Sequence, residues 1–140
     1  MTNNIQQMTV EAVGLLQQLI KTPSVSREEK AVADLMEQQM KLWGLTPKRV
    51  GNNLMLIGKH AEGKPTLLLN AHIDTVKPVS TWTRDPFTPT IEDGRLYGLG
   101  ANDCGGGLVS LLMVYRALCN EDLAYNLVYV ASAEEEVSGA

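Results

Sequence analysis

Three short stretches of this chain carry side chains that bind metal ions and move protons. His72 and Asp74 close the apolar run "LLLNAHIDTV", Asp103 lies in "GLGANDCGGG", and three successive glutamates occupy positions 134–136. One imidazole together with several carboxylates is a ligand set that suits zinc, and a carboxylate also takes up and releases protons. If the fold gathers these side chains, metal-assisted hydrolysis is the chemistry that they support.

The elements around these residues predict that they meet. Residues 64–74 and 126–133 have the pattern of buried strands, and residues 108–118 between them have that of a buried helix. In such a unit the two strands are parallel, and the helix begins at the edge where both strands end. The histidine and the acidic residues all lie at that edge. The first strand is apolar on both faces, which predicts an α/β fold with an open, mostly parallel sheet and helices on both faces.

Carboxylates crowded at this edge require a compensating charge. At an effective dielectric constant of about 20, two like charges about 4 Å apart repel by about 4 kcal/mol. The nearest basic residues along the chain, Lys77 and Arg95, are each separated from the cluster by a turn. A pair of divalent metal ions about 3.5–4 Å apart, bridged by a carboxylate, compensates the charge better and is the recurring core of two-metal hydrolases.

Two helices are expected to open the chain. Apolar residues recur at helical spacing over residues 9–20. Residues 26–44 predict a second, amphipathic helix, with Ser26 and Glu29 in the spacing of a capping box and Gly44 as the stop signal.

Strands and loops are expected between these helices and the acidic motifs. Residues 52–58 predict a short strand that forms a hairpin with the strand at 64–74. Residues 77–90 contain three prolines and many Ser and Thr residues, which predicts a long loop. The pair Asp93-Gly94 between short alternating runs predicts a type I′ hairpin.

The composition is that of one globular domain and excludes several classes of partner. The chain has 140 residues, of which 44% are hydrophobic, and a formal net charge of -4. Because Lys and Arg are scattered along the chain, neither nucleic acid nor a membrane surface is expected as a partner. The chain has no recognisable secretory signal and no apolar run of about 18 residues, so we expect a cytoplasmic protein. Cys104 and Cys119 are too far apart in the sequence to form a Cys-x-x-Cys pair.

The chain resembles the M20 family of zinc-dependent metallopeptidases and amidohydrolases. This family includes acetylornithine deacetylases, succinyl-diaminopimelate desuccinylases, aminoacylases and carboxypeptidases of the G2 kind. The motifs that carry the resemblance, in family order, are "TPSVS", "AHIDTV", "WTRDPFTPTIEDGRLYGLGANDCGGG" and "ASAEEEVSGA". The resemblance implies that His72 is a metal ligand, that Asp74 orients its imidazole, and that Asp103 bridges two zinc ions.

The resemblance also assigns the three glutamates and the reaction. Glu134 takes the place of the leading acid of the family motif, Glu135 is the general base that takes a proton from the attacking water, and Glu136 is a ligand of the second ion. The implied cofactor is two Zn²⁺ ions, with Co²⁺ as a substitute. The implied reaction is hydrolysis of the amide bond of an N-acylated amino acid, as in acetylornithine deacetylase, or of a short peptide.

The resemblance further implies that residues 1–140 are the N-terminal portion of a zinc-binding catalytic domain. Members of the family continue with a further acidic ligand, a lid domain that often forms a homodimer, and a late histidine. We therefore expect the 140-residue chain alone to hold an incomplete site and to be inactive. One departure from the family pattern is Cys104, beside the expected bridging aspartate, which we interpret as a packing residue.

The same residues allow three other interpretations. "GLGANDCGGG" before a helix resembles a phosphate-binding loop, but Asp103 stands where the third glycine belongs and would repel a pyrophosphate. A non-catalytic α/β module that binds a partner through its open edge remains an alternative. So does a two-metal phosphohydrolase, which would prefer Mg²⁺ or Mn²⁺ and a more oxygen-rich ligand set.

Overall fold

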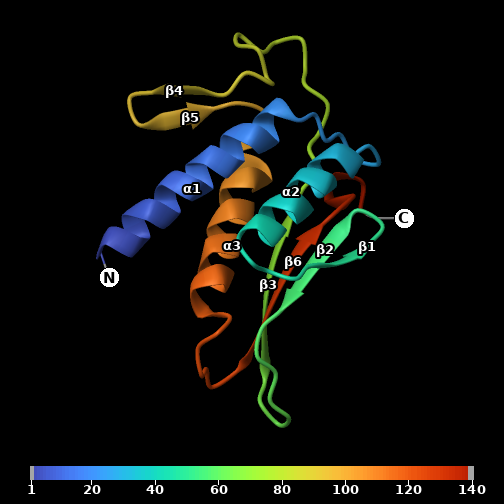
Figure 1. Ribbon diagram of the computed structural model, residues 1–140. Helices are drawn as coiled ribbons and strands as arrows, with labels where there is room; N and C mark the ends of the chain where they lie inside the picture. The colour runs from blue at the N-terminus through green and yellow to red at the C-terminus, as the bar shows by residue number, and fades with distance from the viewer. Residues whose placement is uncertain (1, 139–140) are drawn as a thin grey trace.

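The structure, a computed structural model, describes residues 2–138 as three long helices, a four-stranded sheet and a separate two-stranded hairpin (Figure 1). In chain order the elements are α1 (Thr2–Lys21), α2 (Lys30–Leu42), β1 (Lys48–Val50), β2 (Asn53–Ile57), β3 (Thr66–His72), β4 (Thr90–Glu92), β5 (Arg95–Tyr97), α3 (Gly107–Leu118) and β6 (Asn126–Ser132). A distorted helical turn, Ala101–Gly106, precedes α3, and a short 3-10 turn, Glu135–Val137, follows β6. No helix within residues 2–138 combines the length and the apolar character that crossing a membrane requires.

The predicted βαβ unit is present. β3 and β6 are parallel neighbours in a register that pairs Thr66 with Asn126 and His72 with Ser132, so both strands end at the same edge of the sheet. The α/β class is confirmed. The sheet is mixed rather than mostly parallel, because its strand order is β1-β2-β6-β3 and the other two pairings are antiparallel.

The predicted hairpin between the strands at 52–58 and 64–74 is wrong, because β6 lies between β2 and β3. Leu127 and Tyr129 of β6 are buried on one face, and Val128 and Val130 on the other face are half-buried. A strand that is apolar on both faces buries more surface in the centre of a sheet than at an edge. β2 instead forms a hairpin with β1, a strand that was not predicted from the sequence.

All three helices cover one face of the sheet, whereas the sequence predicted helices on both faces. The side chains of β2 and β6 that face the helices, including Leu54, Leu56 and Tyr129, are buried in one core together with residues from α1, α2 and α3. On the opposite face Ile57 is 43% exposed and Leu68 is 55% exposed. Within residues 2–138 this second face is open, and the apolar pattern that suggested a covering layer there belongs to exposed side chains.

The long loop and the hairpin after β3 were predicted correctly. Residues 77–89 contain no helix or strand. β4 and β5 pair in antiparallel fashion, and the turn between them has positive φ at both central residues, 49° at Asp93 and 73° at Gly94, as a type I′ turn requires.

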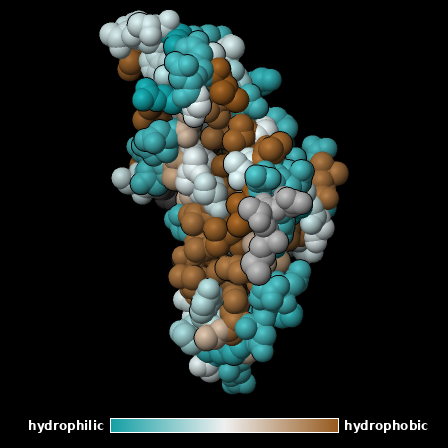
Figure 2. All heavy atoms as spheres, turned by 90° about the vertical axis from the view of Figure 1, so that its left-hand side faces the viewer, coloured by the Kyte–Doolittle hydropathy of each residue, from teal (hydrophilic) through white to brown (hydrophobic). Residues whose placement is uncertain are grey.

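Hydrophobic side chains also gather on the outer face of α1 and α3 (Figure 2). A groove of about 480 Å³ lies between the two helices and is lined by Met8, Val109 and Met113 among others. Ile5 and Val114 on its rim are 65% and 44% exposed.

Candidate metal centre

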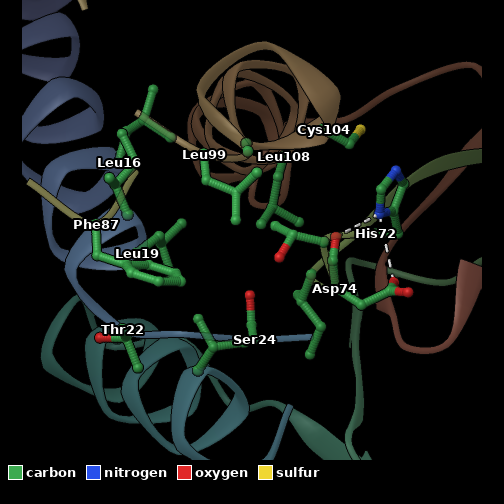
Figure 3. A pocket seen from close by; sticks show the side chains of 16 residues that line it. Leu16, Leu19, Thr22, Ser24, His72, Asp74, Phe87, Leu99, Cys104 and Leu108 are labelled. Atoms are coloured by element: carbon green, nitrogen blue, oxygen red, sulfur yellow. Dashed lines mark hydrogen bonds and ion pairs between the residues drawn. The ribbon is translucent and has the colours of Figure 1, made fainter. Parts of the chain in front are cut away.

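The end of β3 places His72 and Asp74 in a buried position with their polar atoms in contact. His72 is 8% exposed and Asp74 is 0% exposed. The Nδ1 atom of His72 lies 2.9 Å from the main-chain oxygen of Asp74 and 3.4 Å from its Oδ1 atom (Figure 3). When Nδ1–H donates to this carbonyl oxygen, Nε2 is the nitrogen that keeps a free lone pair, and Nε2 faces the other acids. The predicted orienting role of Asp74 therefore involves its main chain as well as its carboxylate.

The turn before α3 brings Asp103 to the same place. Its Oδ1 atom lies 3.1 Å from Nε2 of His72, and its side chain is 75% exposed. Within the helical turn Asp103 alone has extended φ and ψ angles, -113° and 101°. A Cβ atom on Gly105 would lie 2.5 Å from the main-chain oxygen of Gly100, so only glycine lets the turn fold back this closely.

The end of β6 supplies the glutamates, which are anchored on Asp74. The N–H groups of Glu135 and Glu136 donate to Oδ1 and Oδ2 of Asp74, each over 3.1 Å. The Oε2 atom of Glu135 lies 3.9 Å from Nε2 of His72, and its side chain is 60% exposed. Glu134 differs from its two neighbours, since its carboxylate faces Arg27 at 3.6 Å. The sequence pattern had placed Glu134 as the leading acid, and its side chain pairs with a cation of the chain rather than with His72.

The electrostatics of the cluster favour a bound cation. Burial and the neighbouring charges of Asp103, Glu135 and Asp74 raise the pKa of Glu136, although the charge of His72 opposes them. Burial alone would lower the pKa of His72, but the hydrogen bond to Asp103 and the nearby charges outweigh it and raise the pKa. Burial contributes most to the raised pKa of Glu136, and the neighbouring carboxylates add to it. Both disfavour the ionised form, and a positive ion among the carboxylates favours it.

Asp74 is the exception, because its carboxylate is stabilised by donors. Burial by itself raises the pKa of Asp74, but the hydrogen bonds from Ser26 and from the N–H groups of Glu136 and Glu135 outweigh it and lower the pKa. Asp74 therefore stays ionised while it is fully enclosed. Its function in the cluster is that of an acceptor of hydrogen bonds rather than that of a group that exchanges protons.

Among the side chains that the structure describes, two sets have ligand atoms close enough to hold a metal ion. His72, Asp103 and Cys104 form one set, and His72, Glu135 and Glu136 form the other, with all ligand atoms in each set within 4.8 Å of one another. The structure thus brings together His72, Asp74, Asp103, Glu135 and Glu136, the five residues that sequence reasoning selected. It also adds Cys104, which the sequence analysis assigned to packing.

The cavity beneath these residues is too small for a substrate. It has a volume of about 20 Å³ and lies between His72, Asp74 and the apolar side chains of α1 and α3, such as Leu16 and Leu108 (Figure 3). A volume of this size accommodates about one water molecule. A reacting molecule would therefore approach from the opposite, open side, where the carboxylates of Asp103 and Glu135 are exposed.

Sequence reasoning also missed that Ser26 contacts this cluster. Ser26 was interpreted as the N-cap of the second helix, but that helix begins at Lys30, and the Ser26 hydroxyl donates to Oδ2 of Asp74 over 2.6 Å. Glu29 precedes the helix and accepts a hydrogen bond from the N–H of Arg27 over 2.6 Å. No local pattern identifies such a contact, because Ser26 and Asp74 are 48 positions apart.

Comparisons with known proteins identify relatives of this chain. The chain is 33% identical over 141 aligned positions to the acetylornithine deacetylase of Erwinia tasmaniensis, an alignment that covers 91% of this chain and 37% of that protein. It is 30% identical over 134 positions to the succinyl-diaminopimelate desuccinylase of Caulobacter sp., covering 92% of this chain and 34% of that protein. The structure is similar to an M20 family metallo-carboxypeptidase from Sulfolobus solfataricus, with a TM-score of 0.75, 27% identity, and coverage of 91% of this chain and 31% of that one.

These alignments place the chain within a family, although it spans only about a third of the length of the relatives that it matches. Residues 68–140, just over half of the chain, match the family model described as peptidase family M20/M25/M40. The matched range includes the end of β3, the turn before α3 and the glutamates after β6, so all the side chains gathered around His72 lie within it. The chain belongs to peptidase family M20/M25/M40.

Proposed function

We propose that this chain carries part of the active site of a metal-dependent hydrolase that cleaves amide bonds. The observation that carries the proposal is the convergence of one imidazole and three carboxylates, from His72, Asp103, Glu135 and Glu136, at one edge of the sheet. Membership of the family and the name of the metallo-carboxypeptidase that it resembles support a metal-dependent reaction.

The donor set fits zinc. One imidazole nitrogen with carboxylate oxygens is a typical zinc ligand set, and Co²⁺ accepts the same ligands. We propose that His72, Asp103 and Glu136 hold the metal, with Asp103 shared between two ions. The raised pKa of Glu136 supports this assignment, because burial and the neighbouring carboxylates both disfavour its ionised form in the metal-free protein, and a bound cation compensates for both.

The remaining residues are proposed to prepare the reaction. When bound, zinc polarises the amide carbonyl and lowers the pKa of a coordinated water molecule to about 7. Glu135 is the general base, because its carboxylate lies beside His72 and its side chain is 60% exposed to solvent, where a substrate can reach it. It takes the proton of the attacking water and passes it to the departing amine. Asp74 holds the imidazole of His72 and the backbone of Glu135 in place.

The proposed substrate is a small N-acylated amino acid or a short peptide. The acetylornithine deacetylase and the succinyl-diaminopimelate desuccinylase are named for N-acylated amino acids, and the carboxypeptidase is named for peptides. Asp103 and Glu135 are widely exposed, so we propose that residues 1–140 are the N-terminal portion of a catalytic domain. Further segments of a longer protein would complete the ligand set, cover the site and form a homodimer. The chain alone is then expected to be inactive.

Metal binding to the chain tests the first part of the proposal. Zn²⁺ affinity is measured by competition with a chelating dye for the wild type and for His72→Ala, with His60→Ala as the matched control. His60 is the other histidine of the chain and lies exposed in the connection between β2 and β3. We expect His72→Ala to lose the zinc affinity and His60→Ala to retain it. Equal affinities for all three proteins would refute the assignment of the site.

Turnover by a longer protein that contains these residues tests the second part. Acetyl, succinyl and dipeptide substrates are supplied with Zn²⁺ or Co²⁺, and the release of free amine is followed. Glu135→Gln should keep the metal and lose at least about 100-fold in kcat, since a general base contributes about 10²–10⁴-fold. The matched control is Glu62→Gln, in the connection between β2 and β3. A Glu135→Gln protein with nearly normal turnover would show that another group is the base.

A further inference from the structure

The loop between α1 and α2 lies directly against the end of β3. The N–H of Thr75 donates to the main-chain oxygen of Ser24 over 2.9 Å, and the N–H of Ser26 donates to the main-chain oxygen of Thr75 over 3.3 Å. These bonds form a short parallel bridge between Val25 and Thr75. The loop is therefore held in a defined register beside Asp74, although it belongs to a different part of the chain.

The side chain of Ser26 connects this loop to the glutamates through Asp74. Its hydroxyl donates to Oδ2 of Asp74 over 2.6 Å, and the same oxygen accepts the N–H of Glu136 over 3.1 Å. The other carboxylate oxygen accepts the N–H of Glu135 over 3.1 Å. Because a carboxylate is planar, the short bond from Ser26 restricts the rotation of the whole group and thereby the direction of both other bonds.

A second contact joins the same loop to the same turn. The Nε atom of Arg27 lies 3.6 Å from Oε2 of Glu134. Both residues have left-handed backbone conformations, with φ of 76° and 62°. Such conformations are unfavourable in a residue other than glycine and persist only where the surrounding structure imposes them. Arg27 and Glu134 are far apart in the sequence but form an ion pair, and both are strained. The loop between α1 and α2 is therefore held in a fixed position relative to the turn after β6.

We propose that Ser26 is a positioning residue of the metal site, which sets the placement of Glu135 and Glu136 by fixing the carboxylate of Asp74. The proposal rests on the proposed function for its effect on metal binding. Ser26 touches neither metal nor substrate in this arrangement. Loss of a hydrogen-bond partner that contacts a metal ligand directly lowers metal affinity by about 10–100-fold. Because Ser26 acts through Asp74, we expect the lower end of this range, roughly 10-fold. A residue that only stabilised the loop would leave the affinity of the folded protein unchanged.

Three variants separate the role of the hydroxyl from that of packing. Ser26→Ala removes the donor, and Ser26→Thr retains it. Ser24→Ala is the matched control, because Ser24 belongs to the same loop and contacts Thr75 through its main-chain oxygen, which the substitution leaves in place. The first measurement is amide hydrogen exchange by NMR in the metal-free chain, and the second is Zn²⁺ affinity by competition.

In Ser26→Ala we expect faster exchange of the Glu135 and Glu136 amides, unchanged exchange in the centre of α3, and zinc affinity lower by roughly 10-fold. Ser26→Thr and Ser24→Ala should behave as the wild type. Unchanged exchange of both amides in folded Ser26→Ala, or wild-type zinc affinity, would overturn the proposal.

The design also separates this proposal from the proposed function. The amide exchange is measured without metal, so it tests whether Ser26 positions Glu135 and Glu136 even if the wild-type chain binds no zinc. Absence of zinc binding by the wild type would refute the metal site, whereas unchanged amide exchange in Ser26→Ala would refute the positioning role. If Ser26→Ala does not fold, Ser26→Thr decides the matter. Its methyl group changes the volume at this position while the hydroxyl remains, so wild-type affinity supports the proposal, and lost affinity assigns the effect to packing and overturns it.

Discussion

Replacement of Asp74 by asparagine should destabilise the metal-free protein, because no other buried group in the cluster accepts as many hydrogen bonds. The carboxylate is 0% exposed and accepts bonds from the Ser26 hydroxyl and from the N–H groups of Glu135 and Glu136. Asparagine has nearly the same shape, but only one of its two terminal atoms is an acceptor. In either orientation of the amide, its NH₂ group faces at least one N–H donor of the glutamate turn.

The size of the effect follows from these contacts. Losing one hydrogen bond to a charged acceptor costs about 1.5–3 kcal/mol, and each of the remaining bonds weakens because the acceptor becomes neutral. The amide is easier to bury than a carboxylate, which offsets part of the loss. We expect a net decrease of about 2–4 kcal/mol in the free energy of unfolding. For a chain of this length, this corresponds to a fall in Tm of about 10 °C.

The dependence on pH gives this prediction a second, independent check. The pKa of Asp74 is lower in the folded protein than its ordinary value. The stabilisation by its carboxylate is therefore complete above the ordinary pKa of about 3.9 and is lost as the pH falls through the lower folded-state pKa. Asparagine does not titrate, so the difference in stability between wild type and Asp74→Asn should be full at pH 7 and should shrink below pH of about 4.

Urea unfolding, followed by circular dichroism in the presence of a chelator at pH 7 and in acid, measures both quantities. The control is Asp122→Asn, because the Asp122 side chain is 96% exposed and faces only Lys64, at 3.2 Å. This control should change the free energy of unfolding by no more than about 0.5 kcal/mol. An Asp74→Asn protein as stable as the wild type at pH 7 would refute the reasoning, as would a difference that persists unchanged in acid.

Three further predictions concern the same edge of the sheet. Glu136→Gln should raise the stability of the metal-free protein at pH 7, because burial and the neighbouring carboxylates disfavour the ionised form of Glu136 and raise its pKa. In urea unfolding with a chelator, this gain should vanish below pH of about 4, where the acid is protonated in both the folded and the unfolded chain. In an NMR titration without metal, the His72 imidazole should titrate above about pH 6.5, because its pKa is raised in the folded protein. Its protonated form then stabilises the fold fully below that pH, and this stabilisation is lost as the pH rises through the higher folded-state pKa. A titration midpoint below about 6.5 would contradict this prediction. In thermal unfolding, Gly105→Ala should destabilise the protein, because its Cβ atom would lie 2.5 Å from the main-chain oxygen of Gly100. Gly14→Ala should instead stabilise the protein by about 0.5–1 kcal/mol, because Gly14 lies inside α1 with open space around its Cβ position.

Local elements of the fold were predictable because their signals are local. The second helix ends where Gly44 has a φ of 76°, and Asp93-Gly94 forms the expected hairpin turn. The first helix was expected only over residues 9–20 and extends over Thr2–Lys21. Its first turns carry few apolar residues, so the periodicity that identified the rest of the helix is absent there.

The pairing of strands was less predictable, because it depends on competition between distant segments. Turn residues between β2 and β3 favoured a hairpin, but β6 is apolar on both faces and takes the place between them. Burial of a strand on two sides outweighs the shorter connection. The same limit applies to Ser26, whose spacing to Glu29 indicated a cap while its hydroxyl bonds to Asp74.

The sequence by itself determined which residues stand at the candidate site, because the order of strand, helix and strand puts His72, Asp103 and the glutamates after β6 at one sheet edge. Hydrophobic periodicity and turn residues suffice for that conclusion, since each is a property of neighbouring positions. Only the tertiary structure decided that Asp74 anchors the glutamate turn, that Ser26 holds Asp74, and that the helices cover one face of the sheet. These features are contacts between segments far apart in the chain, and their energies depend on which side chains the folded protein brings within hydrogen-bonding distance.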